Sequence, residues 1–254
     1  TPIKGSIKEK YLSLPKEVVT TTMIDHLRFT PIYSQDGELL PYFITVRNGT
    51  RDYEDIVIAG NEKVLGARLE DAKFFYEDDI SKPLEGYVEN LKGVLFHDKL
   101  GSMLEKEKRD GVVAKKIAKS LSFADEAIEA LDRVAHLSKA DLTTKMVIEF
   151  TELQGVMGEI YALKSGEKEI VATAIREQYL PKFAGDALPK SSVGSIFSLA
   201  DKIDTIVGLF AIGEIPTGSA DPFALRRSAI GIINIIRNNA WKFNLSEAIE
   251  TSLY

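Results

Sequence analysis

Residues 1–59 carry short runs of β-branched and aromatic side chains that are separated by turn dipeptides. The run 17–23 (EVVTTTM) and the segment Phe29–Tyr33 have the composition of strands, and Asp36-Gly37 is a hairpin-turn dipeptide. The run 39–46 (LLPYFITV) predicts the returning strand, which ends at Asn48-Gly49. The pattern therefore predicts a small sheet at the start of the chain.

From about Gly60 the apolar positions change to helical spacing. Acidic residues beside Pro83 predict a helix end and a boundary between 80 and 90. We therefore expect an α+β protein, with a β-containing segment and its following helix over 1–85 and a mainly α-helical domain over 90–254. Further helices are predicted over 91–104, 112–121, 124–163, 167–179, 193–210 and 222–236.

The composition is that of a globular protein, because 44% of the 254 residues are hydrophobic and 28% are charged. The chain has no cysteine, which excludes disulfides and thiolate metal sites and fits a reducing, cytoplasmic compartment. No apolar run reaches the roughly 18 residues of a membrane span. The first residue is Thr, so we expect a piece of a longer protein. The net charge of −6 argues against nucleic-acid binding by the overall field and leaves only a local basic patch.

Two acidic residues on one predicted helix are the first candidates for a functional site. Asp201 and Asp204 stand three residues apart, so both carboxylates can face the same way. They can pair with Lys202, Arg226 or Arg227, or they can hold a metal or act as a general base, and the spacing leaves both open. His97-Asp98 is a further possible metal pair, and His26 and His136 are the only other histidines.

The segment that begins Asp221-Pro222 predicts a helix start, because Asp can accept from the first amides and Pro has none to satisfy. Arg226 and Arg227 then lie near the positive end of the helix dipole. That position is plausible if an anion is close, either a carboxylate of the same protein or a phosphate of a ligand.

Several ordered segments are similar to the β subunit of bacterial heterotetrameric glycyl-tRNA synthetase. The resemblance runs from about Leu14 to about Asn238, which is nearly the whole chain. The segments that carry it are LPYFITVRNG (40–49), GNEKVLGARLEDAKFFYEDD (60–79), KADLTTKMVIEFTELQGVMG (139–158), YLPKFAGDALP (179–189), LADKIDTIVGLF (199–210) and PTGSADPFALRR (216–227).

The resemblance implies a role in the ATP-dependent joining of glycine to its tRNA. In that family the adenylate chemistry belongs to the α subunit, with its ATP and Mg²⁺, and the β subunit binds tRNA. No phosphate loop of the P-loop or dinucleotide type occurs in the chain. We therefore expect an internal fragment that is not catalytic alone and carries no cofactor. Its expected partners are the α subunit, tRNA-Gly and the remaining β-subunit domains, with no membrane.

The helical region also resembles the HD superfamily of metal-dependent phosphohydrolases. The resemblance places Asp201 at the last metal ligand and Asp141 at the aspartate of the His-Asp pair, where Ala140 replaces the histidine. It therefore predicts a degenerate HD-like site, made of Asp141, Asp201 and Asp204, that binds no metal. Two alternatives stay open: an active HD phosphohydrolase that uses Asp201 with some of His97, His136 and Asp141, and a purely structural docking module.

For tRNA, the groups that can reach the ribose-phosphate backbone are lysines and arginines. The basic run 97–119 carries a local net charge of +3, and further cations lie at the junction of the β segment and the following helix. The candidates are Arg47, Lys63, Arg68, Lys99, Lys106, Lys108, Arg109, Lys115, Lys116, Arg226 and Arg227.

Overall fold

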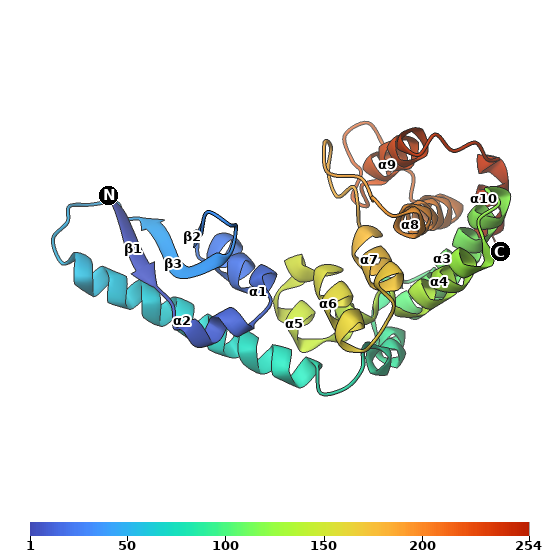
Figure 1. Ribbon diagram of the computed structural model, residues 1–254. Coiled ribbons are helices and arrows are strands. Elements are labelled where there is room, and N and C mark those ends of the chain that lie inside the picture. Colours follow the sequence, from blue (N-terminus) through green and yellow to red (C-terminus); the bar gives the residue numbers. More distant parts are fainter. Residues whose placement is uncertain (254) are drawn as a thin grey trace. The chain divides into compact units, whose positions relative to one another are not determined.

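An antiparallel sheet of three strands opens the chain in the computed structural model, which describes residues 1–253 (Figure 1). Its strands β1 (Pro2–Ser6), β2 (Thr30–Tyr33) and β3 (Leu39–Val46) are arranged in the order β1-β3-β2. The hairpin predicted between β2 and β3 is confirmed, and Gly37 has the positive φ of 83° that its turn requires. The strand β1 lies outside the predicted segments.

The chain divides into two units, 1–81 with 149–153 and 82–148 with the chain from 154 onward. In the first unit Phe43 is 1% exposed and stacks on Phe29 with ring centroids 4.6 Å apart. Gly5 stands opposite Phe43 in β1, and a Cβ at Gly5 would lie 2.3 Å from the Phe43 ring. The sheet therefore closes around one aromatic side chain.

The run 17–23 is helical, so the strand predicted there is wrong. It forms α1 (Lys16–Thr21) and the π-helical turn Thr22–His26, after a 3-10 turn over Glu9–Ser13. Two pairs of residues in this segment are spaced by four positions: Val18 with Thr22, and Val19 with Met23. All four side chains are fully buried. A buried stripe at helical spacing outweighs the modest preference of β-branched residues for strands.

The long helix α2 (Glu54–Asp79) completes the main body of the first unit. Its buried positions Leu65, Leu69, Ala72 and Tyr76 follow helical spacing, as the sequence predicts. The helix begins six residues before the predicted start. The Tyr11 hydroxyl donates to the main-chain oxygen of residue 66 at 3.1 Å, which ties α2 to the N-terminal segment.

The second unit is helical apart from a short hairpin. The hairpin of β4 (Leu95–His97) and β5 (Gly101–Ser102) replaces most of the helix predicted over 91–104, and Gly101 has φ +84°. The remaining elements are η3 (Leu84–Gly93), α3 (Met103–Ser120), α4 (Asp125–Leu137), η4 (Ala140–Thr143), α5 (Lys145–Glu149), α6 (Val156–Lys164), α7 (Glu169–Glu177), α8 (Ser192–Ala211), α9 (Leu225–Asn238) and α10 (Leu245–Ser252); η5 (Thr151–Leu153) belongs to the first unit.

Helix α3 is the centre of the second unit, because it packs against α4, α8 and α10. Helix α8 in turn packs against α7 and α9. In Figure 1, α8 is the orange helix beside the red helix α9. Among residues 1–253, no helix combines the length and the apolar character needed to cross a bilayer.

Helix caps fix where the elements of the second unit begin. Ser102 and Glu105 form a reciprocal capping box at the start of α3. The N-cap position of α9 is Ala224, and the Asp221 carboxylate, three residues before it, accepts from the amides of Leu225 at 2.8 Å and Arg226 at 3.0 Å. The helix nevertheless starts at Leu225 and not at Pro222, because Ala224 adopts φ +54°. The predicted start is therefore wrong by three residues.

Gly111 permits the close approach of α3 and α4, because a Cβ there would lie 2.6 Å from the Cβ of Ala135. We predict that Gly111→Ala lowers the free energy of unfolding by about 1–3 kcal/mol, since overpacking outweighs the better helix propensity of alanine. Urea unfolding measures this change. The control Gly66→Ala on α2, where nothing lies within 4 Å of the added methyl, should stabilise by about 0.5–1 kcal/mol. A stabilised Gly111→Ala variant would contradict the close contact.

Candidate functional site

A buried ionic cluster joins α3, α8 and the segment that follows α4. Lys106, Asp110, Lys139 and Asp204 are each at most 4% exposed, and the Asp201 side chain is 18% exposed. Lys106 and Asp110 are four residues apart on α3, and Asp201 and Asp204 are three apart on α8, so each pair faces the other helix. Five charged groups therefore share one low-dielectric site.

Lys106 is the hub of this cluster. Its Nζ lies 3.0 Å from Asp110 Oδ1, 3.2 Å from Asp204 Oδ2 and 3.4 Å from Asp201 Oδ1. It also donates to the main-chain oxygen of Asp201 at 3.1 Å. A second ammonium, from Lys139, lies 3.0 Å from Asp201 Oδ1 and 4.3 Å from the centre of the Tyr179 ring.

Arg109 closes the cluster on its outer side. Its Nε lies 2.9 Å from Asp204 Oδ1, and its Nη1 donates to the main-chain oxygen of Leu100 at 3.1 Å. Asp204 therefore receives a lysine and an arginine at once. A buried carboxylate requires this degree of compensation.

The pKa values in the cluster show which charges the surroundings stabilise. Burial alone would lower the pKa of Lys106, but the carboxylates of Asp110, Asp201 and Asp204 outweigh it and raise that pKa. Burial would raise the pKa of Asp201, but the neighbouring lysines, Lys106 first, hold it below its usual value. Burial raises the pKa of Asp110 to about 7, because Lys106 offsets only part of the desolvation.

Asp141 has a different environment, although the sequence groups it with Asp201 and Asp204. It is fully buried, and its Oδ2 accepts from the amides of Gly155 at 2.6 Å and Gly158 at 3.1 Å. Burial raises its pKa to about 6 despite these amides. Asp141 therefore fixes the turn into α6, and Gly158 leaves room for its carboxylate.

The residues do not fit the metal centre that the HD resemblance implies. Among residues 1–253, no group of three His, Asp or Glu side chains is arranged to hold a metal ion. His136 lies on the surface, 3.0 Å from Glu85, and His97 Nδ1 accepts from the amide of Lys99. Neither histidine is therefore available to the carboxylates of α8 in an HD-type site, and the geometry does not support the phosphohydrolase alternative.

After Lys106 and Lys139, the charge of the expected partner Lys202 also lowers the pKa of Asp201, but the hydrogen bonds of Lys202 go to other groups. Lys202 donates to Ser198 Oγ at 2.7 Å and to the oxygen of Leu180 at 2.9 Å. Arg226 donates to the main-chain oxygen of Thr217, a residue that does not belong to the cluster. Sequence reasoning did not identify Asp110 and Lys139 as members of the buried ionic cluster. The four-residue spacing of Lys106 and Asp110 is the one local signal that could have indicated Asp110.

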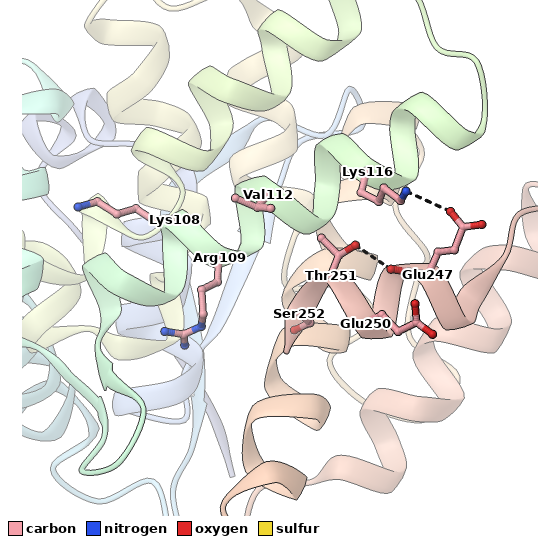
Figure 2. Close-up of a pocket in the computed structure, with 8 residues that line it drawn as sticks. All are labelled: Lys108, Arg109, Val112, Lys116, Glu247, Glu250, Thr251 and Ser252. Atoms are coloured by element: carbon pink, nitrogen blue, oxygen red, sulfur yellow. Dashed lines mark hydrogen bonds and ion pairs between the residues drawn. The ribbon is translucent and has the colours of Figure 1, made fainter. Parts of the chain in front are cut away.

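The outer face of α3 carries exposed cations beside a groove of about 640 Å³. Figure 2 shows Lys116 of α3 meeting Glu247 of α10 across this groove. The ammonium nitrogen and the carboxylate oxygen of this ion pair are 3.1 Å apart. Lys108 is exposed at the other end of the same lining, and Arg109 also borders it. Lys115 is paired with Asp132 on α4 at 2.6 Å.

The other cations predicted for tRNA contact differ in their exposure. Lys106 is 3% exposed and ion-paired, so the prediction that it reaches a phosphate is wrong in this fold. Arg47 and Arg68 belong to the first unit, where the former donates to the oxygen of Asp52 at 2.6 Å. Arg226, held by Thr217 O, is nevertheless exposed, and so are Lys63, Lys99 and Arg227.

Glu107 gives the cluster a pH dependence that can be measured. Burial raises its pKa from 4.5 to about 8, although it accepts from the amide of Lys139 at 2.7 Å. The folded state therefore holds this proton more tightly than the unfolded state. Its stabilising contribution is full below about pH 4.5 and is lost as the pH rises through about 8.

We predict that Glu107→Gln flattens the pH dependence of stability and makes the chain more stable than the wild type at pH 8.5, by up to a few kcal/mol. Urea unfolding at pH 5, 7 and 8.5 measures the difference between the two proteins. Glu129→Gln, an exposed carboxylate of α4, is the matched control and should leave the slope unchanged. Parallel curves for wild type and Glu107→Gln would rule out a protonated Glu107.

Comparison with known proteins identifies the family. The family model described as "Glycyl-tRNA synthetase beta subunit" matches residues 1–254. The chain is 52% identical over 245 residues to the glycine–tRNA ligase beta subunit of Limosilactobacillus reuteri, and 49% identical over 249 residues to that of Listeria monocytogenes. It covers 36% of each relative, and 96% and 98% of the chain are aligned, so it spans about a third of the length of these curated relatives. The chain belongs to the glycyl-tRNA synthetase beta subunit family.

Proposed function

We propose that this chain is the part of a cytoplasmic glycine–tRNA ligase β subunit that binds tRNA-Gly and supports aminoacylation at the α subunit. The relatives are named as beta subunits of glycine–tRNA ligase, which makes an α subunit the expected partner. ATP and Mg²⁺ act at the α subunit in this proposal, and the chain contributes binding and positioning of the tRNA.

The observation that carries tRNA binding is the two-sided character of α3. Cations on its inner face, such as Lys106, are neutralised by buried carboxylates. Lys108 and Lys116 lie on its outer face, beside an open groove. An exposed ammonium can exchange a counterion or a weak surface partner for a phosphate, whereas a buried and paired one cannot.

Lys116 shows why a surface pair does not prevent this exchange. Its partner Glu247 is 49% exposed, and an exposed ion pair contributes only about 0–1 kcal/mol. A backbone phosphate competes with such a carboxylate because it belongs to a dense row of charges, and its binding releases condensed counterions. The acidic chain can therefore bind a polyanion through one local surface, although its net charge is −6.

We predict that Lys108→Gln and Lys116→Gln each weaken tRNA-Gly binding by roughly fivefold at low salt and reduce the salt slope by about one. Each variant removes one phosphate contact and leaves the fold intact. A gel-shift titration of the chain with its α subunit over a salt series measures both quantities. Lys164→Gln, an exposed lysine of α6, is the control. Equal losses in all three variants, or none in any, would contradict a tRNA surface on α3.

A second prediction separates the chemistry from the recognition. The chain alone should give no glycine-dependent exchange of pyrophosphate into ATP, because its sequence contains no phosphate loop for the nucleotide. Exchange should require the α subunit. The assay is run with each subunit alone and with both together, and glycine-dependent exchange by the chain alone would place adenylate chemistry here.

A further inference from the structure

The loop 181–190, which connects α7 to α8, presents an aromatic side chain to solvent. Phe183 near its start is 59% exposed, and among residues 1–253 its ring stacks on no other ring and carries no cation. A single exposed ring is common on protein surfaces, so the groups around it decide what it can bind.

Asp186 holds this loop in one conformation. Its carboxylate accepts from the amide of Lys182 at 2.7 Å and from that of Ala187 at 2.8 Å. The amide of Asp186 donates to the main-chain oxygen of Phe183 at 3.2 Å, and Gly185 between them has φ +83°. The negative charge is thus turned into the loop. Because the backbone that carries the ring is already ordered, a ligand that binds the ring loses little affinity to ordering the loop.

The loop rests on one side of α9. A Cβ at Gly231 would lie 3.4 Å from Cγ of Pro181, so the backbone of α9 and the start of the loop are close together. Arg227 stands one turn before Gly231 and Asn234 one turn after it, so both border this side of the helix. Both side chains are exposed. The loop that carries Phe183 therefore has a guanidinium and an amide beside it.

The cations of this surface have no carboxylate to neutralise them. Helix α9 contains three arginines and no acidic residue. Lys182 and Lys190, at the two ends of the loop, are exposed. Within the described part of the chain, neither of these lysines nor Arg227 forms an ion pair with a carboxylate. An anion can bind here without breaking an existing pair, in contrast to Lys116 on α3, which is paired with Glu247.

An exposed ring among unpaired cations has the composition of a site for single-stranded nucleic acid. A base stacks on the ring, and the cations contact the phosphates on either side of it. Bases inside a duplex are stacked on their neighbours and do not offer their faces, so such a site selects the unpaired nucleotides of loops and ends.

We propose that Phe183 stacks on an unpaired base of tRNA-Gly and that Lys182, Lys190 and Arg227 contact the phosphates beside that base. The inference rests on the proposed function, because it takes tRNA-Gly as the ligand. It adds a second surface, built from α9 and the loop 181–190, to the one on α3. The two surfaces differ in chemistry, because the α3 surface offers charge and this one also recognises the face of a base.

The test is a gel-shift titration of the assembled enzyme of α and β subunits with tRNA-Gly over a salt series. Phe183→Ala should weaken binding roughly tenfold and leave the salt slope unchanged, because the ring carries no charge. Phe183→Trp keeps an aromatic face and should bind as the wild type does. Arg227→Gln should weaken binding by roughly fivefold and reduce the salt slope by about one. Phe210→Ala removes a ring of α8 that is 47% exposed, and this control should behave as the wild type.

A competition experiment tests the preference for unpaired bases. A short single-stranded RNA should displace tRNA-Gly from the wild-type enzyme better than a blunt RNA duplex with the same number of phosphates. Phe183→Ala should remove this difference. Because the side chain of Phe183 is exposed, the variant should keep the melting temperature of the wild type, so that a loss of binding does not come from unfolding.

The outcomes separate this inference from the proposed function. If the wild type binds tRNA-Gly and Phe183→Ala binds it equally well, stacking is refuted and the proposed function stands. If the wild-type enzyme does not bind tRNA-Gly, the proposed function fails and this inference fails with it. If Phe183→Ala instead weakens the association of the α subunit, measured by sedimentation, the loop is a protein contact and the inference is wrong.

Discussion

The contact between one ammonium and three aspartates sets the relation of α3 to α8 in the helical unit. Lys106, Asp110 and Asp204 are almost completely buried and the Asp201 side chain is 18% exposed, so each of the four is costly to leave unpaired. The contact therefore demands a single register of the two helices, because a shift of one turn would strand the carboxylates. Apolar packing supplies the driving force for burial. The ionic network then selects the one packing arrangement of α3 and α8 in which every buried charge is paired.

The same network divides the cations of the basic run between two roles. Lys106 faces α8, where it is buried and ion-paired, whereas Lys108, two positions along the helix, is exposed to solvent. The basic run thus contributes less positive surface than its residue count suggests. The outer face of α3 still carries positive charge beside the α10 groove. This local charge can attract an anionic ligand even though the chain as a whole is acidic.

The sequence predicts those features that have a local cause. The hairpin at Asp36-Gly37 follows from turn chemistry, and the buried stripe of α2 follows from residues spaced alternately four and three positions apart. The helix at Val18 and Val19 could not be separated from a strand, because β-branched runs fit both and only burial decides. The family was recognisable because long segments agree in order.

The cluster could be predicted only in part. The spacing of Asp201 and Asp204 places them on one face, and both do contact Lys106. Their partner stands 95 or more residues earlier in the chain, so no local pattern indicates it. A lysine in a charge run normally lies on the surface. Only the tertiary packing of α3 shows that this one is buried.

Arg109 stands at the border between the buried network and the open groove. Its side chain is 28% exposed and lines the cavity, yet its Nε is bound to Asp204. An anion that enters from solvent meets a guanidinium whose charge is already matched. To bind Arg109, this anion would have to weaken the ion pair between Arg109 on α3 and Asp204 on α8. Binding of an anion in the groove and the packing of α3 against α8 are therefore linked through the side chain of Arg109.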